Sequence, residues 1–143
     1  MHAISRRSLF TVAIAAGVLV VGSAYPALAG DVQVMLSGSQ EVPPVTSSGS
    51  GSGTISIRDD KTVSGSVTTT RVTGTMAHIH NGAAGKNGPV VIPLTKTGDN
   101  GWAVPPGAKL TDAQYAAFKA GDLYVNVHSA QNQGGEIRGQ LKP

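Results

Sequence analysis

Three histidines are the residues of this chain best suited to binding chemistry. His78 and His80 are two positions apart, and His128 follows much later in the chain. Neutral imidazoles, without a thiolate or an obligatory carboxylate, are ligands of intermediate softness. Such ligands suit copper or zinc. Copper(II) outranks zinc in intrinsic affinity for such ligands. We therefore predict a metal site formed by His78, His80 and His128, with copper as the first candidate and zinc as the second.

These histidines lie in segments that we expect to be β-strands, in which residues two apart point to the same face. His78 and His80 share one face of the expected strand Thr73–His80, and His128 lies on one face of the expected strand Leu123–His128. The opposite faces carry apolar residues, namely Ala77, Ile79, Val125 and Val127. If these fill the core, all three histidines stand on the outer face of the sheet. They converge if the two strands are neighbours; otherwise they are incidental surface residues.

The remaining sequence predicts an all-β fold. Residues after position 29 are rich in Gly, Ser, Thr and Val, with turn signals at short intervals, which is typical of a β-sandwich or barrel. Asp59-Asp60-Lys61 is the expected tip of a hairpin. A single short helix is expected over about residues 111–120, with Thr111 and Gln114 as a capping box and Gly121 at its end. The expected strands are Val32–Leu36, Gly53–Arg58, Val63–Thr69, Thr73–His80, Val90–Pro93, Leu123–His128 and Glu136–Leu141.

The first 29 residues have the form of a signal peptide. Arg6 and Arg7 precede an apolar run from Leu9 to Val21, and Ala27-Leu28-Ala29 is a small-x-small cleavage pattern. The twin arginines also resemble a bacterial Tat signal, although Sec signals begin with basic pairs too. The run is too short for a comfortable membrane span. We therefore expect residues 30–143 to form one exported domain, periplasmic or secreted, with no stable membrane span after cleavage.

Composition narrows the functional classes. The chain has no cysteine, so no thiolate can bind metal or act as a nucleophile, and no disulfide can form. Without Arg6 and Arg7, its eleven Lys and Arg residues become nine, against eight Asp and Glu. No basic run or aromatic ladder indicates a nucleic-acid partner. No serine–histidine–aspartate or paired-carboxylate pattern indicates a catalytic site, so binding is favoured over catalysis.

Four ordered motifs resemble those of chordin-type (CHRD) domains. They are Leu36–Pro44 (LSGSQEVPP), Ala77–Gly85 (AHIHNGAAG), Leu123–Ser129 (LYVNVHS) and Gly134–Leu141 (GGEIRGQL). The resemblance spans residues 30–143. It implies a Greek-key β-sandwich of immunoglobulin-like size, commonly secreted and often bacterial, whose biochemical role is poorly defined.

A weaker similarity, to copper–zinc superoxide dismutases, concerns the order of the histidines. It implies that His78, His80 and His128 correspond to copper ligands on the outside of the barrel. The chain departs from that family because Asn81 to Leu94 contains no histidine for a bridging or zinc site, and because the disulfide cysteines are missing. Arg138 lies near the position of that family's active-site arginine, but in a different local register.

Several single residues have simpler interpretations. We expect the prolines after Glu41 to rigidify the chain, and Glu136 and Arg138 to be a solvated pair on one strand face. Tyr124 and Asn126 share the face of His128, where they either donate hydrogen bonds around the metal site or form ordinary polar sheet surface.

Three functions remain open at this point. The first is an exported copper-binding protein for storage, delivery or sequestration, with a protein partner for metal transfer. The second is a structural or adhesive module that binds protein or polysaccharide, with incidental histidines. The third is a copper oxidoreductase. The sequence leaves the oligomeric state open.

Overall fold

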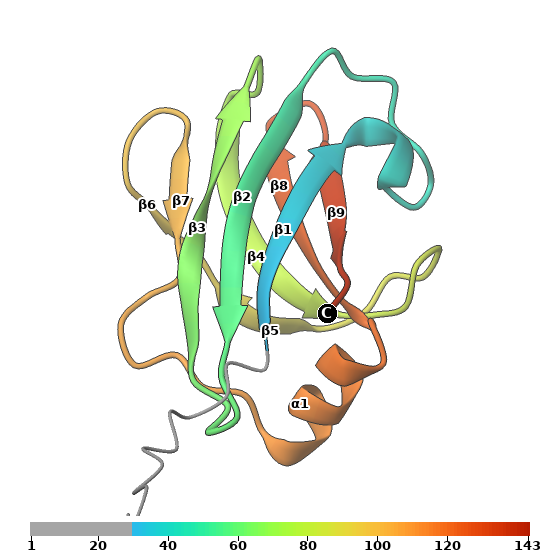
Figure 1. Ribbon diagram of the computed structural model, residues 1–143. Helices are drawn as coiled ribbons and strands as arrows, with labels where there is room; N and C mark the ends of the chain where they lie inside the picture. Colours follow the sequence, from blue (N-terminus) through green and yellow to red (C-terminus); the bar gives the residue numbers. More distant parts are fainter. Residues whose placement is uncertain (1–29) are drawn as a thin grey trace, which may run out of the picture.

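The computed structural model describes residues 30–143, which form an all-β fold with one short α-helix, as predicted (Figure 1). The expected signal peptide, residues 1–29, lies outside the described residues. The strands are β1 (Gly30–Ser37), β2 (Ser50–Ile57), β3 (Val63–Thr70), β4 (Gly74–Asn81), β5 (Val90–Pro93), β6 (Thr95–Lys96), β7 (Gly101–Ala103), β8 (Leu123–Ser129) and β9 (Ile137–Leu141). A 3₁₀ turn, η1 (Gly38–Gln40), follows β1, and the helix α1 spans Asp112–Lys119.

All nine strands belong to one antiparallel sheet that nearly closes on itself. Their order is β5-β4-β8-β9-β1-β2-β3-β7-β6. Consecutive strands β3 and β4, and likewise β7 and β8, are not neighbours, so the chain crosses between sides of the sheet in the Greek-key manner that we predicted. The two ends of the sheet approach each other: Lys96 of β6 donates its Nζ–H to the carbonyl of Gly74 in β4 at 3.0 Å, and only Leu94 separates β5 from β6.

The core lies between the inner faces of this sheet. Alternation along β1 buries Val32, Val34 and Leu36 and exposes the residues between them. The predicted inward residues of the histidine-bearing strands are also in the core, since Ala77, Ile79, Val125 and Val127 are buried. The face assignment of β4 and β8 is therefore confirmed, and the histidines lie on the outer face.

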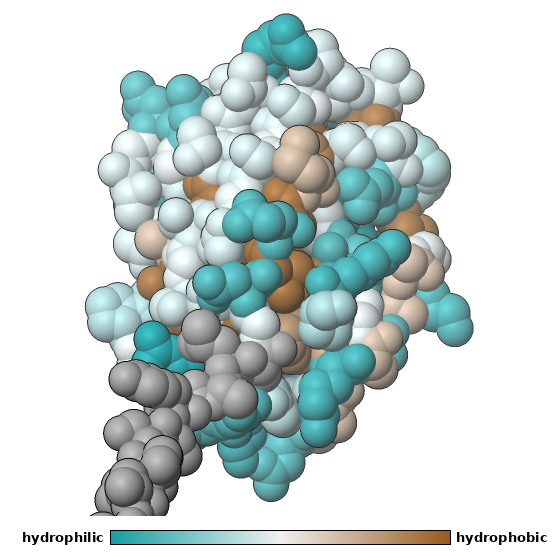
Figure 2. All heavy atoms as spheres, viewed as in Figure 1, coloured by the Kyte–Doolittle hydropathy of each residue, from teal (hydrophilic) through white to brown (hydrophobic). Residues whose placement is uncertain are grey.

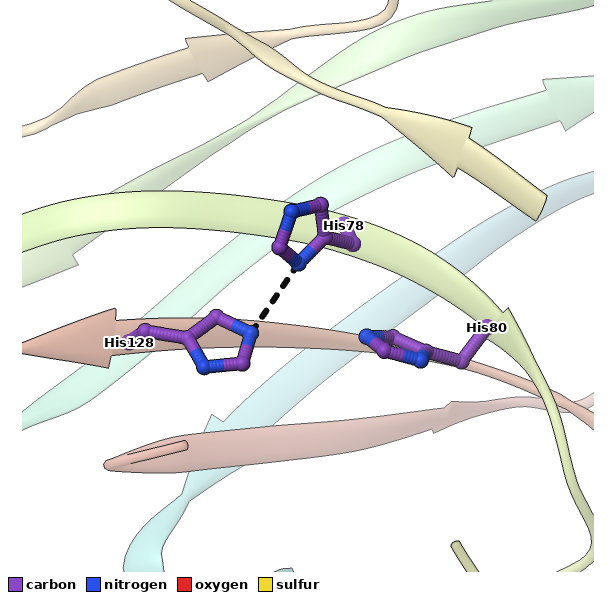
Figure 3. Close-up of side chains that lie close together, drawn as sticks. All are labelled: His78, His80 and His128. Carbon is purple, nitrogen blue, oxygen red and sulfur yellow. Dashed lines mark hydrogen bonds between the residues drawn. The ribbon is translucent and has the colours of Figure 1, made fainter. Parts of the chain in front are cut away.

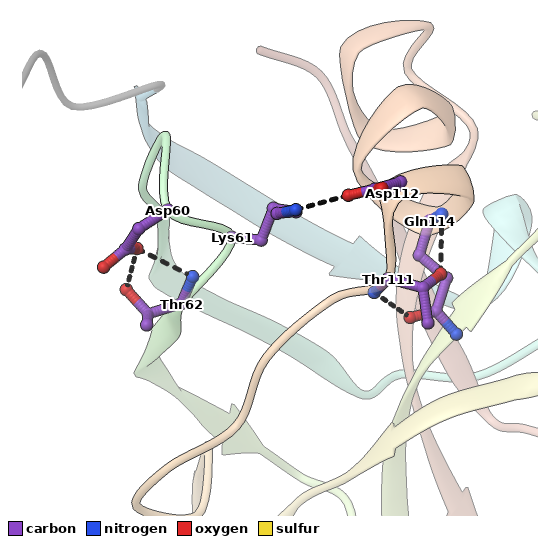
Figure 4. Close-up of polar contacts among 6 residues, drawn as sticks. All are labelled: Asp60, Lys61, Thr62, Thr111, Asp112 and Gln114. Carbon is purple, nitrogen blue, oxygen red and sulfur yellow. Dashed lines mark hydrogen bonds and ion pairs between the residues drawn. The ribbon is translucent and has the colours of Figure 1, made fainter.

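Helix α1 covers one end of the sheet and begins and ends as predicted. Gln114 donates its N–H to Thr111 Oγ1 at 3.2 Å, and Thr111 donates its own N–H to Gln114 Oε1 at 2.9 Å, so the capping box is complete (Figure 4). Gly121 follows at φ 79°, where a residue without Cβ is favoured. Phe118 anchors the helix in the core.

The β2–β3 hairpin turns at Asp59 and Asp60, as predicted, and contacts the helix. Lys61 pairs with Asp112 (Figure 4). The Tyr115 hydroxyl donates to Asp59 Oδ1 at 3.0 Å. Because Asp112 is largely exposed, this ion pair contributes little to stability.

Strands β6 and β7 were not predicted. They are two and three residues long, so neither is long enough to show a period-two pattern. Trp102 of β7 pairs in register with Val67 of β3, and its side chain is buried in the core.

The surface shown in Figure 2 is largely hydrophilic, with scattered apolar side chains. The large exposed apolar residues are Met35, Met76 and Val90. Within residues 30–143, no helix has the length and apolar character needed to cross a membrane.

Candidate metal centre

The three predicted histidines come together on neighbouring strands. β4 carries His78 and His80, and β8, which pairs with β4, carries His128. In the antiparallel register His128 lies opposite Met76, one side-chain position along the same face from His78. One ring nitrogen from each histidine lies within 4.8 Å of the other two (Figure 3). This group could hold a metal ion.

Backbone carbonyls fix the tautomers of two of the rings. His80 Nδ1 lies 2.9 Å from the carbonyl oxygen of Gly88, and His128 Nδ1 lies 2.8 Å from that of Gln133. A carbonyl oxygen only accepts, so each Nδ1 carries the hydrogen and each Nε2 keeps a lone pair. Metal-binding histidines are commonly held this way, by a hydrogen bond from the nitrogen that does not bind the metal.

Both Nε2 lone pairs point into the histidine group. The Nε2 atom of His80 is buried and forms no hydrogen bond of normal geometry, although the nearby Asn126 side chain acts to raise the pKa of the ring. The Nε2 atom of His128 lies 3.0 Å from Nδ1 of His78, from which it accepts a hydrogen bond (Figure 3). Two nitrogens that bind one ion at about 2.0–2.1 Å each lie about 3 Å apart. The pair His78–His128 thus already has a suitable spacing, and metal would replace the shared hydrogen.

Loops cover much of this outer face, which strand alternation alone does not predict. His80 and His128 are only 8% and 7% exposed, and His78 is the most accessible of the three. Burial lowers the pKa of the His78 imidazole, and its neighbours His128 and His80 lower it further. Burial also lowers the pKa of His80. The hydrogen bond to Gly88 acts in the opposite direction but does not cancel this effect. Both shifts favour the neutral imidazoles that bind metal.

Comparison with known proteins identifies the family. The model of the CHRD domain matches residues 32–141, which include all four sequence motifs. The chain belongs to the CHRD domain family. CHRD domains occur in extracellular proteins. No curated protein and no solved structure matches the chain, so the weaker similarity to copper–zinc superoxide dismutases stays a prediction.

In this CHRD domain, Tyr124 of β8 supports the histidine group. Its ring stacks on His80, with ring centroids 4.8 Å apart and an interplanar angle of 2°. Its hydroxyl accepts the N–H of Gly88 at 3.3 Å, so Tyr124 holds both the imidazole and the residue that fixes its tautomer. Tyr124 is buried rather than part of an ordinary polar surface, and a role in supporting a bound metal stays a prediction.

Arg138 of β9 is buried, so the prediction of a solvated pair with Glu136 is wrong. Its guanidinium lies 3.5 Å over the ring of Tyr124 and donates to the carbonyl of Ala83 at 3.0 Å. Glu136 instead accepts a hydrogen bond from Ser47 at 2.7 Å. The outward direction of the Arg138 side chain agrees with the alternation of the strand. The loop after β4 then covers this face and buries the side chain. Arg138 therefore contacts the residue that supports His80.

Glu41 and Asn126 are two further buried polar residues on this side of the CHRD domain. Asn126 donates to the carbonyl of Gly134 at 3.4 Å, and its Oδ1 atom is buried without a partner. Glu41 is 4% exposed, and burial raises the pKa of its carboxyl group to about 7, although the positive charge of Arg138 opposes that shift. The sequence analysis did not predict that Glu41 is buried. The only feature that singled out this residue is its place in the family motif Leu36–Pro44.

Proposed function

We propose that this protein is an exported copper-binding CHRD protein, with His78, His80 and His128 as the metal ligands. The observation that carries the proposal is the convergence of three ring nitrogens within 4.8 Å, two of them with lone pairs set by backbone carbonyls. The unpartnered, buried Nε2 of His80 supports it, because a buried nitrogen lone pair without a partner is costly unless something binds there.

Copper is favoured over zinc by the donor set. Three neutral imidazoles bind copper(II) more tightly than zinc by intrinsic affinity. Storage, delivery or sequestration outside the cytoplasm requires only that the ion be held and released. His78, the most accessible ligand, gives the side from which an ion or a metal-transfer partner would approach.

A metal count tests the proposal directly. The purified protein is stripped with a chelator, incubated with copper or with zinc, desalted and analysed for bound metal. We expect about one copper per chain, and less zinc retained under the same conditions. Nitrogen hyperfine structure in the electron paramagnetic resonance spectrum of the copper(II) form would identify imidazole ligands. Folded protein that retains no copper would contradict the proposal, and retention of zinc alone would remove copper as the metal.

The affinity for copper should depend on pH in a direction set by the histidines. Protons compete with the metal for each imidazole, and burial places the pKa of His78 and His80 below the usual value of 6.5. We therefore expect affinity to stay constant from pH 8 to about 6.5 and to fall only in more acidic solution. Competition titrations with a chelator of known pH dependence measure this. A steep fall already between pH 8 and 7 would contradict it.

The apoprotein should also lose stability over the acidic range. The unfolded chain, with ordinary histidine pKa values, takes up protons first as pH falls through 6.5, while the folded chain resists protonation of His78 and His80. Stability and copper affinity thus both decrease as pH falls. Copper affinity must therefore be measured only at pH values where circular dichroism shows that the chain is folded.

We also propose that residues 1–29 are removed during export, leaving residues 30–143 as the working domain. The basic pair Arg6 and Arg7, the apolar run and Ala27-Leu28-Ala29 support this. Mass spectrometry of the protein isolated from its host should find the N-terminus at Gly30 or within about two residues of it. An intact chain that begins at Met1 in the membrane fraction would contradict this prediction.

A further inference from the structure

A cavity beside Arg138 lies outside the histidine group. A cavity of about 410 Å³ opens between the segment after β1, the loop after β4 and the last strand. Its volume lies within the range of about 300–1,000 Å³ that is usual for small-molecule pockets. Its lining includes the charged residues Glu41, Arg138 and Lys142 and the apolar residues Val42, Pro44 and Ala84.

Two buried groups of opposite charge line this cavity without pairing with each other. Glu41 and Arg138 are 4% and 1% exposed, yet Lys61–Asp112 is the only ion pair within residues 30–143. Glu41 Oε1 is buried and forms no hydrogen bond of normal geometry, although the Asn126 side chain and the Val42 backbone lie close enough to lower the pKa of the carboxyl group somewhat. Leaving a buried charged group unsatisfied is costly, which points to a partner that occupies the space between the two side chains.

Arg138 has donors to spare for such a partner. Its Nη1 donates to Asn87 Oδ1 at 3.4 Å, and its Nη2 donates to the carbonyl of Ala83 at 3.0 Å and to Gln140 Oε1 at 3.1 Å. A guanidinium has five N–H groups, so these contacts do not use all of them. Its planar donor arrangement matches a carboxylate. Exposed Lys142 adds positive charge to the lining.

We propose that this cavity binds a small organic carboxylate that also carries a hydrogen-bond donor, of which amino acids and hydroxy acids are the simplest. The carboxylate accepts from Arg138, and the amino or hydroxyl group donates to Glu41. Val42, Pro44 and Ala84 provide apolar contacts for a carbon body, and the cavity is much larger than an inorganic anion. The raised pKa of Glu41 is consistent with a carboxyl group that lacks its partner.

The proposal is independent of the metal site, although the two sites share a wall. Arg138 lies against the ring of Tyr124, on which His80 stacks. Binding must therefore be measured on metal-free protein, since amino acids also bind copper directly.

Nuclear magnetic resonance titration of the ¹⁵N-labelled, metal-free protein tests the ligand class. Glycine and lactate should each shift the backbone amides of Gln40, Ala84 and Gln140 in a saturable way. Acetate lacks the donor and glycinamide lacks the carboxylate, so each should bind at least about ten-fold more weakly, as expected when one charge-assisted contact is lost. No saturable shift with glycine or lactate, or equal binding of phosphate or glucose, would overturn the proposal.

Two variants test the location. Ala84 is exposed on a loop, so Ala84→Leu should narrow the cavity without disturbing the fold, and Glu41→Gln keeps the side-chain size but removes the charge. We expect each to weaken glycine binding at least about ten-fold, while Lys109→Gln, which changes an exposed lysine outside the lining, leaves it unchanged. The copper count of Ala84→Leu should stay at the wild-type value. If Ala84→Leu and Glu41→Gln both bind glycine as the wild type does, the cavity is not the site, whatever the outcome at the histidines.

Discussion

Replacing His128 with alanine should lower the affinity for copper by more than about 100-fold, because changes outside the ligand set alone cost 10–100-fold. His128 is the only ligand from β8, and its Nε2 lies 3.0 Å from Nδ1 of His78, the shortest of the contacts between the rings. Only His78 and His80, both on β4, would remain as ligands. Neither can replace the nitrogen that His128 contributes from β8. Isothermal titration or chelator competition on the folded variant measures the loss.

The same result is expected for His78→Ala and His80→Ala, with different side effects. His80 stacks on Tyr124, so its removal also loosens the support of the loop after β4. His78 is the least buried, so His78→Ala is the variant most certain to keep the wild-type fold. Asp99→Ala changes an exposed turn residue and serves as the matched control, which should bind copper like the wild type. If all three histidine variants keep a full copper equivalent, the ion binds elsewhere.

The sequence predicted the faces of the histidine strands because period-two alternation is a local property. The apolar residues Ile79 and Val127 belong to the core, which places the histidines beside them on the other face. Whether β4 and β8 are neighbours depends on the crossing connections between distant segments, which alternation does not encode. The family motifs indicated the fold class, whereas the histidines come together because Ala77 of β4 pairs with Val127 of β8.

What covers the outer face could not be predicted for a related reason. A strand pattern says that Arg138 and Glu136 share a face, but not that a loop folds over that face near Arg138. Glu41 follows a short 3₁₀ turn and is brought over the same face by the chain after β1. The burial of both charged residues therefore results from tertiary packing of loops, for which isolated prolines and glycines gave only turn signals.

Gly88 connects the loop after β4 directly to the histidine group. Its carbonyl accepts from His80 Nδ1 at 2.9 Å, and its N–H donates to the Tyr124 hydroxyl at 3.3 Å. A Cβ atom at this position would overlap the carbonyl oxygen of Asn81 and lie 2.7 Å from the carbonyl carbon. Both atoms belong to the backbone, so no side-chain rotation relieves the overlap, and the loop itself must move.

Gly88→Ala should therefore weaken copper binding about 10–100-fold, the usual cost of losing a residue that orients a metal ligand. The reason is that His80 loses the carbonyl that keeps its hydrogen on Nδ1 and its lone pair on Nε2. A changed electron paramagnetic resonance spectrum of bound copper(II) would separate this effect from a general loss of stability. Gly98→Ala is the matched control, because a Cβ there meets no atom within 4 Å. If Gly88→Ala binds copper with wild-type affinity and an unchanged spectrum, the Gly88 carbonyl does not position His80, and the ring must be held by its stacking on Tyr124 alone.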